Sequence, residues 1–467
     1  MTDFSWTDLE VRRAIGLRTD LGTEDTAFSE ISTDTRTLRP GALYVALVGD
    51  RFDGHDYVAD AVAGGAAGVV VARSVPGARE VTVYPVADTL VALGALAAHR
   101  RRALECPVVA ITGSTGKTTT KDLLAAALGS SRRTHATRGS RNNRVGVPLT
   151  LLETPSDTEA VVLELGTNEP GEIRTLTAIV QPDIAVITNV GESHLEKLGS
   201  VAGVMEEKLD LLRGNGTSAW AVVGDEPSEL AAAARHIRPD VTVAGWSERA
   251  DEDARPDDAE ADAFGRYRFH WRGVPVAMPL PGRHAVSNAV LALTVAGLLG
   301  IPAAEAVRGL EHAKTADLRG QMRTIGGLTV IVDCYNANPP SVRAALNLLE
   351  AYEASSRKVA VLGTMLELGA ASARLHEEVL EFALAREIDF FVATGGFADA
   401  ASRFASVGDE RVISAADWRE AYPSVKKRLS GDEVVLLKAS RGIALEGMLP
   451  LLEADFAADD GKRGVTV

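Results

Sequence analysis

The chain has 467 residues, of which 46% are hydrophobic and 24% are charged, a mixture typical of a folded protein and not of a disordered one. Its 49 Lys and Arg against 64 Asp and Glu give a formal net charge of −15, which argues against non-specific nucleic-acid binding. A local positive pocket for a small phosphate-bearing molecule is still compatible with that charge. Two cysteines, Cys106 and Cys334, cannot form a disulfide framework, so a reducing compartment is expected.

The N-terminal residues lack the basic start and the apolar core of a signal peptide. The longest apolar stretch, residues 289–302, is too short to cross a bilayer and is expected to form a buried helix. The sequence therefore predicts a cytoplasmic protein without membrane insertion and without a nucleic-acid partner.

The apolar runs divide the chain into three blocks, in line with a length that predicts about three domains. The first block covers residues 1–105. Its strands are expected at 41–49 and 68–72, and its helices at 57–63 and 89–102. These units predict a small α/β domain.

The second block, residues 106–313, has apolar strands that alternate with helices. The strands are expected at 108–112, 160–165, 184–188 and 219–223, with a helix at 117–128. This alternation predicts a mostly parallel sheet that is covered on both faces. The acidic stretch 247–261 is expected to be an exposed loop, followed by a short β excursion at 264–276.

The third block, residues 314–467, repeats the α/β alternation. Its strands are expected at 329–333, 358–362, 390–394 and 434–438, and the tail from Ala457 is expected to fray. The predicted fold class is therefore α/β in three domains: an N-terminal α/β module, a central and mostly parallel α/β domain, and a C-terminal Rossmann-like α/β domain.

The sharpest local pattern is ITGSTGKTT at residues 111–119, where an apolar strand leads through a glycine turn into a helix. The free N–H groups and the positive dipole end of such a helix form an anion site. The residues expected around the phosphates of a nucleotide are Gly113, Ser114, Thr115, Gly116, Lys117, Thr118 and Thr119. Lys117 would place a cation on the transferring phosphate, and Thr118 would offer a hydroxyl to Mg²⁺.

The strict P-loop pattern has a further glycine where this chain has Ile111, so the loop is a shortened form, and a plain tight turn is the alternative. Glu164 ends an apolar strand, where parallel-sheet proteins direct functional groups at a ligand. His194 follows the next strand, and Lys208 lies further on, in an expected helix. Taken singly, these three side chains would be an ordinary loop carboxylate, a structural histidine and a solvated surface charge.

Taken together and in this order, the motifs resemble those of the Mur ligase family. The stretches that carry the resemblance are 33–36 and 40–55 in the first block, 113–119, 142–148, 164–173 and 194–200 in the second, and 335–339, 362–369 and 438–442 in the third. The first-block stretches and the sequence YNANP at 335–339 indicate the branch that adds D-alanyl-D-alanine to UDP-N-acetylmuramoyl-tripeptide.

The resemblance implies an ATP-dependent ligase of peptidoglycan precursor synthesis that forms an acyl phosphate and releases ADP and phosphate. It implies two Mg²⁺ ions, one at Thr118 and Glu164 and one at His194 and a carbamylated Lys208. It also implies that Lys117, Glu164, His194 and Lys208 are catalytic, that closure of the third domain completes the site, and that the protein is a monomer.

The same resemblance assigns the remaining binding residues. Nucleotide contacts are expected from Asn288, Arg323, Asp333, Tyr335 and Asn336. Contacts to the UDP-linked substrate are expected from Thr33, Asp34, Thr35, Arg36, Gly49, Arg51, Phe52, Asp53, His55, Asn142 and Asn143. The chain departs from the family pattern at Ala285, Val342 and Thr364, and Thr364 could alter the amine that is accepted.

Two alternatives stay open. One is a sister ligase that adds another amino acid or dipeptide, although the Asp-Asn-Pro-Arg stretch of ligases that add diaminopimelate is missing. The other is a nucleotide-binding scaffold without catalytic activity. A dinucleotide-dependent dehydrogenase is disfavoured because no strand leads into Gly-x-Gly-x-x-Gly.

Overall fold

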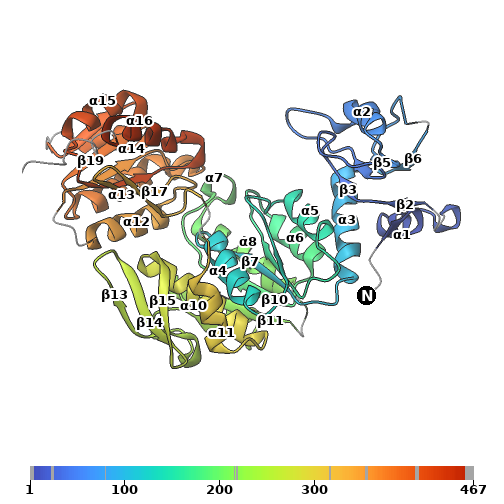
Figure 1. Cartoon of the computed structure of the whole chain (residues 1–467), viewed down its shortest axis with the longest axis horizontal. Helices are drawn as coiled ribbons and strands as arrows, with labels where there is room; N and C mark the ends of the chain where they lie inside the picture. The colour runs from blue at the N-terminus through green and yellow to red at the C-terminus, as the bar shows by residue number, and fades with distance from the viewer. Residues whose placement is uncertain are drawn as a thin grey trace, which may run out of the picture.

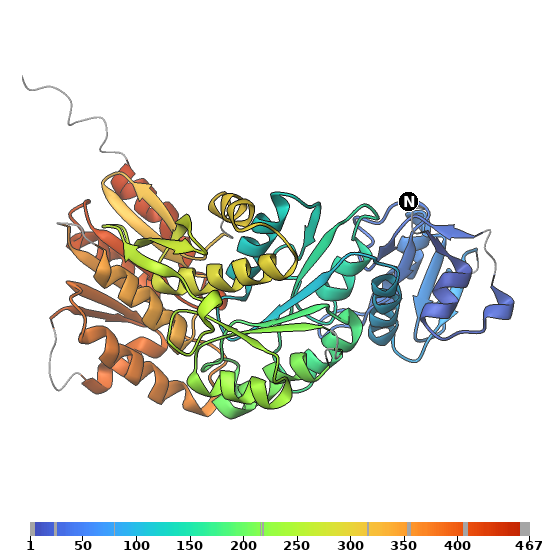
Figure 2. The same cartoon turned by 90° about the horizontal axis from the view of Figure 1, so that it is seen from below.

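The computed structural model describes residues 5–22, 26–78, 80–214, 216, 219–314, 317–352, 356–404 and 410–457. Three lobes follow one another in chain order, with the first and the third at opposite ends of an elongated molecule (Figures 1 and 2). Among these residues no helix combines the length and the apolar character needed to cross a membrane. The ends of the chain beyond Ala457, where fraying was expected, lie outside the described residues.

The first lobe contains a four-stranded parallel sheet in the order β3-β4-β5-β6 and a short antiparallel pair, β1-β2. Its strands are β1 (Trp6–Thr7), β2 (Ala27–Phe28), β3 (Ile31–Ser32), β4 (Leu43–Val45), β5 (Gly68–Val71) and β6 (Thr82–Pro85). Its helices are α1 (Asp8–Ala14), η1 (Thr19–Leu21), η2 (Gly54–Tyr57), α2 (Val58–Ala63) and α3 (Thr89–Arg102). The last of these, α3, also packs on the second lobe.

The second lobe is built on a six-stranded sheet, all parallel, in the order β12-β11-β10-β7-β9-β8. Its strands are β7 (Val108–Thr112), β8 (Thr134–Ala136), β9 (Ala160–Glu164), β10 (Ile184–Ile187), β11 (Trp220–Gly224) and β12 (Thr242–Ala244). Every residue of β7, β9 and β10 is buried, as expected for parallel strands covered on both faces.

Helices cover both faces of this sheet. They are α4 (Lys117–Gly129), α5 (Gly146–Leu152), α6 (Glu172–Val180), α7 (Leu195–Leu198), α8 (Val201–Arg213), α9 (Ser228–Ile237), η3 (Glu252–Ala254), α10 (Arg283–Leu298) and α11 (Ala303–Glu311). The apolar stretch that begins at residue 289 lies mostly in the buried helix α10, which packs along α4.

The acidic stretch 247–261 is not a loop throughout, and the sequence-based expectation was wrong in its second half. Residues 257–261 form β13 (Asp257–Ala261), which pairs with β14 (Arg266–Trp271), and β14 pairs with β15 (Val274–Pro281). Only one residue of β13 is even half-buried, so its composition lacks the apolar alternation of a strand. Charged residues on such an edge strand also discourage pairing with other chains.

The third lobe carries a second six-stranded sheet in the order β16-β17-β21-β18-β19-β20, parallel except for the edge strand β16. Its strands are β16 (Gln321–Ile325), β17 (Leu328–Asp333), β18 (Lys358–Leu362), β19 (Phe390–Thr394), β20 (Val412–Ala415) and β21 (Val434–Lys438). Its helices are α12 (Pro339–Ala351), η4 (Gly369–Ala371), α13 (Ser372–Leu384), α14 (Gly396–Phe404), α15 (Trp418–Arg428), η6 (Arg441–Ile443), η7 (Leu445–Met448) and α16 (Leu449–Phe456). The two edge strands, β16 and β20, were not expected from the sequence.

The second and third lobes share one buried apolar cluster, which runs from strands β7 and β9 to strands β17 and β18. The helix α12 faces this seam and begins at a capping box, in which Asn338 and Ser341 exchange hydrogen bonds behind Pro339. The carboxyl ends of both sheets therefore open toward a common space between the lobes.

Candidate active site

The phosphate loop lies between β7 and α4, and its two glycines cannot be replaced. Gly113 and Gly116 have φ values of +152° and +78°. A Cβ at Gly113 would lie 1.9 Å from Thr188 Oγ1, and a Cβ at Gly116 would lie 2.3 Å from Asn288 Oδ1. The loop is therefore held against both the β10 end and helix α10, with its backbone N–H groups at the start of α4.

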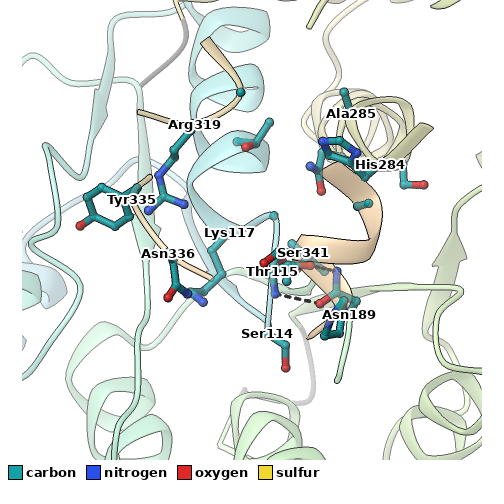
Figure 3. A pocket seen from close by; sticks show the side chains of 18 of the residues that line it. Ser114, Thr115, Lys117, Asn189, His284, Ala285, Arg319, Tyr335, Asn336 and Ser341 are labelled. Carbon is teal, nitrogen blue, oxygen red and sulfur yellow. Dashed lines mark hydrogen bonds between the residues drawn. The ribbon is translucent and has the colours of Figure 1, made fainter. Parts of the chain in front are cut away.

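The side chains of this loop are braced by the loop that follows β10. Asn189 Oδ1 accepts a hydrogen bond from the Thr115 N–H at 2.9 Å, and its Nδ2 donates to Thr115 Oγ1 at 2.7 Å (Figure 3). Ser114 Oγ accepts a hydrogen bond from the Gly191 N–H at 3.0 Å. Asn189 was not singled out from the sequence, because a lone Asn after a strand has no distinguishing pattern.

Lys117 and Thr118 begin α4 and point to different partners. Lys117 Nζ donates to the carbonyl oxygen of Gly113 at 2.7 Å and lines the cavity between the lobes. Burial lowers the pKa of Lys117, while the carboxylate of Glu164 acts in the opposite direction. Thr118 Oγ1 donates to Glu164 Oε2 at 2.7 Å.

Glu164 is the centre of a small oxygen cluster. It ends β9 directly beside β7, its side chain is buried, and its second oxygen, Oε1, accepts a hydrogen bond from Asn142 Nδ2 at 2.8 Å. The Thr118 hydroxyl and the Glu164 carboxylate are oxygen donors of the kind that Mg²⁺ prefers, whereas Asn142 presents its amide nitrogen. Asn143 lines the cavity between the lobes, and its Oδ1 accepts hydrogen bonds from the Val145 and Gly146 N–H groups just before and at the start of α5.

His194 reaches across to the third lobe. Its Nδ1 lies 2.6 Å from Glu367 Oε2, and both residues have positive φ values, 53° and 63°. The contact with His194 lowers the pKa of Glu367. Glu367 lies within the motif noted at 362–369 but was not singled out, because a loop carboxylate gives no sign of which lobe it faces.

Lys208 is fully buried on α8, and within the described part of the chain its Nζ has no hydrogen-bond partner. Burial lowers the pKa of Lys208 well below its ordinary value, and the ammonium of Lys117 adds to this effect. An isolated cation in such a place is costly, so the lysine is suited to a neutral or modified state.

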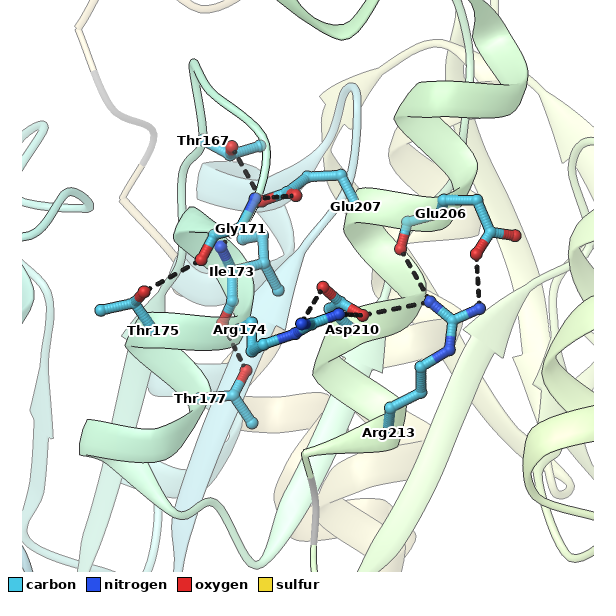
Figure 4. A network of polar contacts seen from close by, with 10 residues as sticks. All are labelled: Thr167, Gly171, Ile173, Arg174, Thr175, Thr177, Glu206, Glu207, Asp210 and Arg213. Carbon is cyan, nitrogen blue, oxygen red and sulfur yellow. Dashed lines mark hydrogen bonds and ion pairs between the residues drawn. The ribbon is translucent and has the colours of Figure 1, made fainter.

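The neighbouring residue Glu207 ties α8 to the loop before α6. Its carboxylate accepts hydrogen bonds from the Gly171 and Ile173 N–H groups, at 2.6 and 2.8 Å, and from Thr167 Oγ1 at 3.1 Å (Figure 4). A carboxylate at the start of a helix is favoured by the helix dipole. Glu207 thus fixes the backbone on which Lys208 lies.

A cavity of about 420 Å³ is lined by Lys117, Glu164 and His194 and extends to the third lobe, whereas Thr118 and Lys208 are not among its lining residues. From α10 it is lined by His284 and Asn288, and the Asn288 Oδ1 accepts a hydrogen bond from Thr120 Oγ1 at 3.2 Å. From the third lobe it is lined by Asp333, Tyr335, Asn336 and Lys438. Lys438 Nζ donates to Asp333 Oδ2 at 2.7 Å and to the Asn336 carbonyl oxygen at 2.8 Å. The Lys438 ammonium thus links the residues that line the third-lobe side of the cavity.

The arginine that faces this cavity is Arg319, whereas the sequence analysis expected Arg323. Arg319 stacks on the Tyr335 ring at 3.9 Å and lies on the third-lobe side of Lys117 (Figure 3). Arg323 lies within the edge strand β16, where its guanidinium donates to Gln321 Oε1 at 3.2 Å, and it is not among the residues that line the cavity. Arg319 and Arg323 are close in the sequence, so the spacing of motifs alone did not show which of the two faces the cavity.

The structure does not bring the expected first-lobe residues to this cavity. Asp34 pairs with Arg36 at 2.6 Å, and that arginine lowers the pKa of Asp34 to about 2. His55 is buried between Asp53, which contacts its Nδ1 at 2.6 Å, and the Ala72 N–H, which donates to its Nε2 at 2.8 Å. The cavity lining includes none of the residues Thr33, Asp34, Thr35, Arg36, Gly49, Arg51, Phe52, Asp53 and His55.

Phe52 is an apolar residue that is nevertheless 57% exposed, and Val48 is exposed to 63%. The first lobe thus offers an apolar surface of its own, separate from the cavity between the other two lobes.

In the described residues no cluster of three or more His, Cys, Asp or Glu side chains has the arrangement of a metal site. The Thr118 hydroxyl and the Glu164 carboxylate are oxygen donors of the kind that Mg²⁺ prefers, and Lys208 is buried without a hydrogen-bond partner among the described residues.

Three family models match the chain in order. The model described as "Mur ligase family, catalytic domain" matches residues 27–101, "Mur ligase middle domain" matches 111–296, and "Mur ligase, glutamate ligase domain" matches 319–441. The chain belongs to the Mur ligase family.

Two of the similar proteins match nearly the whole chain. The UDP-N-acetylmuramoyl-tripeptide--D-alanyl-D-alanine ligase of Bacillus subtilis (strain 168) is 37% identical over 430 residues, which are 91% of this chain and 93% of that protein. A crystal structure of MurF from Acinetobacter baumannii has a TM-score of 0.87 and 32% identity, and the match covers 97% of this chain and 100% of that chain.

A third relative carries a nucleotide. MurF ligase from Thermotoga maritima, solved in complex with ADP, has a TM-score of 0.80 and 27% identity over 92% of this chain and 98% of that chain. The three-domain α/β fold expected from the sequence is confirmed by these structures.

Proposed function

We propose that the chain is an ATP-dependent ligase that joins D-alanyl-D-alanine to UDP-N-acetylmuramoyl-tripeptide, giving the pentapeptide product, ADP and phosphate for peptidoglycan synthesis. The observation that carries this proposal is the shared cavity. The phosphate loop of the second lobe and a wall of Arg319, Asp333 and Tyr335 from the third lobe face each other across it. The names of the similar proteins supply the substrates.

The first step would transfer a phosphoryl group to the acid. An oxygen of the tripeptide carboxylate attacks the γ-phosphorus of ATP, the bond to the β–γ bridging oxygen breaks, and ADP leaves. Both reactants are anions, so positive charge must offset their repulsion. Lys117, whose Nζ lies at the loop, would supply that charge, and the N–H groups at the start of α4 would hold the phosphates.

The second step would form the amide. The amine of the dipeptide attacks the carbonyl carbon of the acyl phosphate, a proton leaves the nitrogen, and inorganic phosphate departs. Water would destroy the acyl phosphate, so the site must be closed. The contact of His194 with Glu367 holds the second and third lobes together beside this point.

Thr118 and Glu164 would hold one Mg²⁺, and His194 with a carbamylated Lys208 would hold a second. The two ions would neutralise charge on the transferring phosphoryl group. The buried, unpaired Nζ of Lys208 supports the carbamate, because carbamylation needs an unprotonated amine and burial favours that form.

Phosphate release tests the function. With ATP and UDP-N-acetylmuramoyl-tripeptide present, we expect release when D-alanyl-D-alanine is added and little release with single amino acids. Release with a single amino acid instead would identify a sister ligase. ATP binding without phosphate release under any of these conditions would identify a scaffold without catalytic activity.

A further inference from the structure

A second cavity, of about 660 Å³, lies on the other flank of the phosphate-loop helix. It is lined by Thr118, Lys121 and Asp122 of α4, by β8 and the residues after it up to Gly139, and by third-lobe residues that include Arg319 and Tyr335. Positions 118, 121 and 122 share one face of a helix. Helix α4 therefore separates two cavities that have Arg319 and Tyr335 in common.

The strand order of the sheet shows where the second cavity lies relative to the first. The first cavity runs along the carboxyl ends of the strands, from Glu164 at β9 to Gly224 and Ala244 at β11 and β12. The second cavity lies at the opposite edge, at β8. The second cavity therefore offers a further approach to the start of α4, at Thr118.

The charges in the second cavity are unbalanced. Lys121 is paired with Asp122 at 2.6 Å, and Arg441 is paired with Glu446. Within the described residues, Arg138, Lys314 and Arg319 form no ion pair, and the Arg319 guanidinium lies over the Tyr335 ring. These three cations face a single unpaired carboxylate, Asp317, so the cavity has an excess of positive charge.

We propose that this basin, defined by Arg138, Lys314 and Arg319, binds the free carboxylate of a peptide co-substrate. The inference rests on the proposed function and adds a subsite to it. Guanidinium and ammonium groups on separate elements suit a carboxylate that must be oriented while the other end of its peptide reacts. The carboxylate is that of the incoming dipeptide or one on the UDP-linked tripeptide.

Kinetics of the variants Arg138→Gln and Lys314→Gln test the subsite. Both side chains are exposed, so neither change should disturb folding. We expect the KM for one peptide substrate to rise about tenfold in each variant, as for a lost hydrogen bond to a charged group, while the KM for ATP changes less than about twofold. Lys427→Gln, an exposed lysine on α15 that lines neither cavity, is the matched control.

A neutral analogue separates the two sources of the carboxylate. If the dipeptide supplies it, the wild-type protein discriminates against D-alanyl-D-alanine amide, and both variants lose that discrimination. If the tripeptide supplies it, the discrimination is unchanged and the KM for the UDP-linked substrate rises. Either result supports the subsite.

The proposal is overturned if both peptide KM values stay unchanged, if only the KM for ATP rises, or if Lys427→Gln has the same effect. Failure of the proposed function looks different, because the wild-type protein itself would then release no phosphate with the co-substrates.

Discussion

The first lobe and the seam between the other two lobes satisfy their polar side chains in different ways. In the first lobe, Asp34, Arg36 and His55 are occupied by neighbours in the same lobe. At the seam, His194 meets Glu367 of another lobe, and Lys208 has no hydrogen-bond partner among the described residues. The first-lobe motifs and the seam motifs, which are equally conspicuous in the sequence, therefore differ in the partners of their polar groups. The first-lobe groups stabilise the local fold, whereas the seam leaves groups available for ligands.

The largest effect is expected at the seam, from Lys117→Ala. This change removes the Lys117 side chain, whose Nζ lies at the phosphate loop and is proposed to offset charge on the transferring phosphate. We expect kcat/KM for phosphate release to fall by about 10³-fold or more, with an unchanged circular-dichroism spectrum. Near-normal product formation by a folded Lys117→Ala protein would remove the loop from the mechanism.

A smaller effect is expected from Glu207→Gln, because Glu207 acts through the backbone that carries Lys208. We expect a loss of about 10- to 100-fold in kcat with little change in the KM for ATP. Glu206→Gln is the control, since Glu206 is adjacent, lies on the same helix and pairs only with surface Arg213. Equal losses in both variants would mean that the helix surface and not the carboxylate of Glu207 matters.

The pair Arg319→Gln and Arg323→Gln tests the assignment of the seam arginine. We expect the first variant to raise the KM for ATP by about tenfold and the second to change it by less than about twofold. The measurement is initial-rate kinetics with varied ATP. The reverse order would restore the residue that the sequence alone suggested.

The smallest effects are expected from two substitutions in the first lobe. One should change the stability of the fold, and the other should change substrate binding. His55→Ala leaves the Ala72 N–H without its acceptor, so we expect the free energy of unfolding in urea to fall by about 1–3 kcal/mol. Phe52→Ala should change it by less than about 0.5 kcal/mol, because the ring is exposed. If this apolar surface holds the UDP end of the substrate, Phe52→Ala should raise the KM of the UDP-linked substrate instead.

The fold was largely predictable because its buried strands are short, continuous apolar runs. The strands at 358–362 and 390–394 begin and end where the sequence placed them. Edge strands such as β13 and β16 were missed, because exposure removes the apolar signal from a strand. Hydrophobic periodicity in a sequence indicates which residues are buried, and an edge strand has few buried residues.

The site was less predictable, since its geometry depends on contacts between lobes. The phosphate loop is local and could be located from spacing. Glu367 and Arg319 could not be chosen, because only the docking of the third lobe shows which side chains face the cavity. The sequence around Lys208 suggests a surface lysine, and only the packing of α8 reveals that the side chain is buried.

Helix α3 has a consequence for how the molecule can be divided. Leu93 and Leu96 belong to the apolar core of the first lobe, whereas Ala97 packs in the cluster of the second. At its end, Arg101 Nε donates to the Val180 carbonyl oxygen at 2.9 Å. A fragment that stops at residue 105 would expose the apolar side of α3 that packs on the second lobe. A fragment that starts there would lose the packing of α3 on the second lobe. We therefore expect an isolated first lobe to aggregate unless α5 is included.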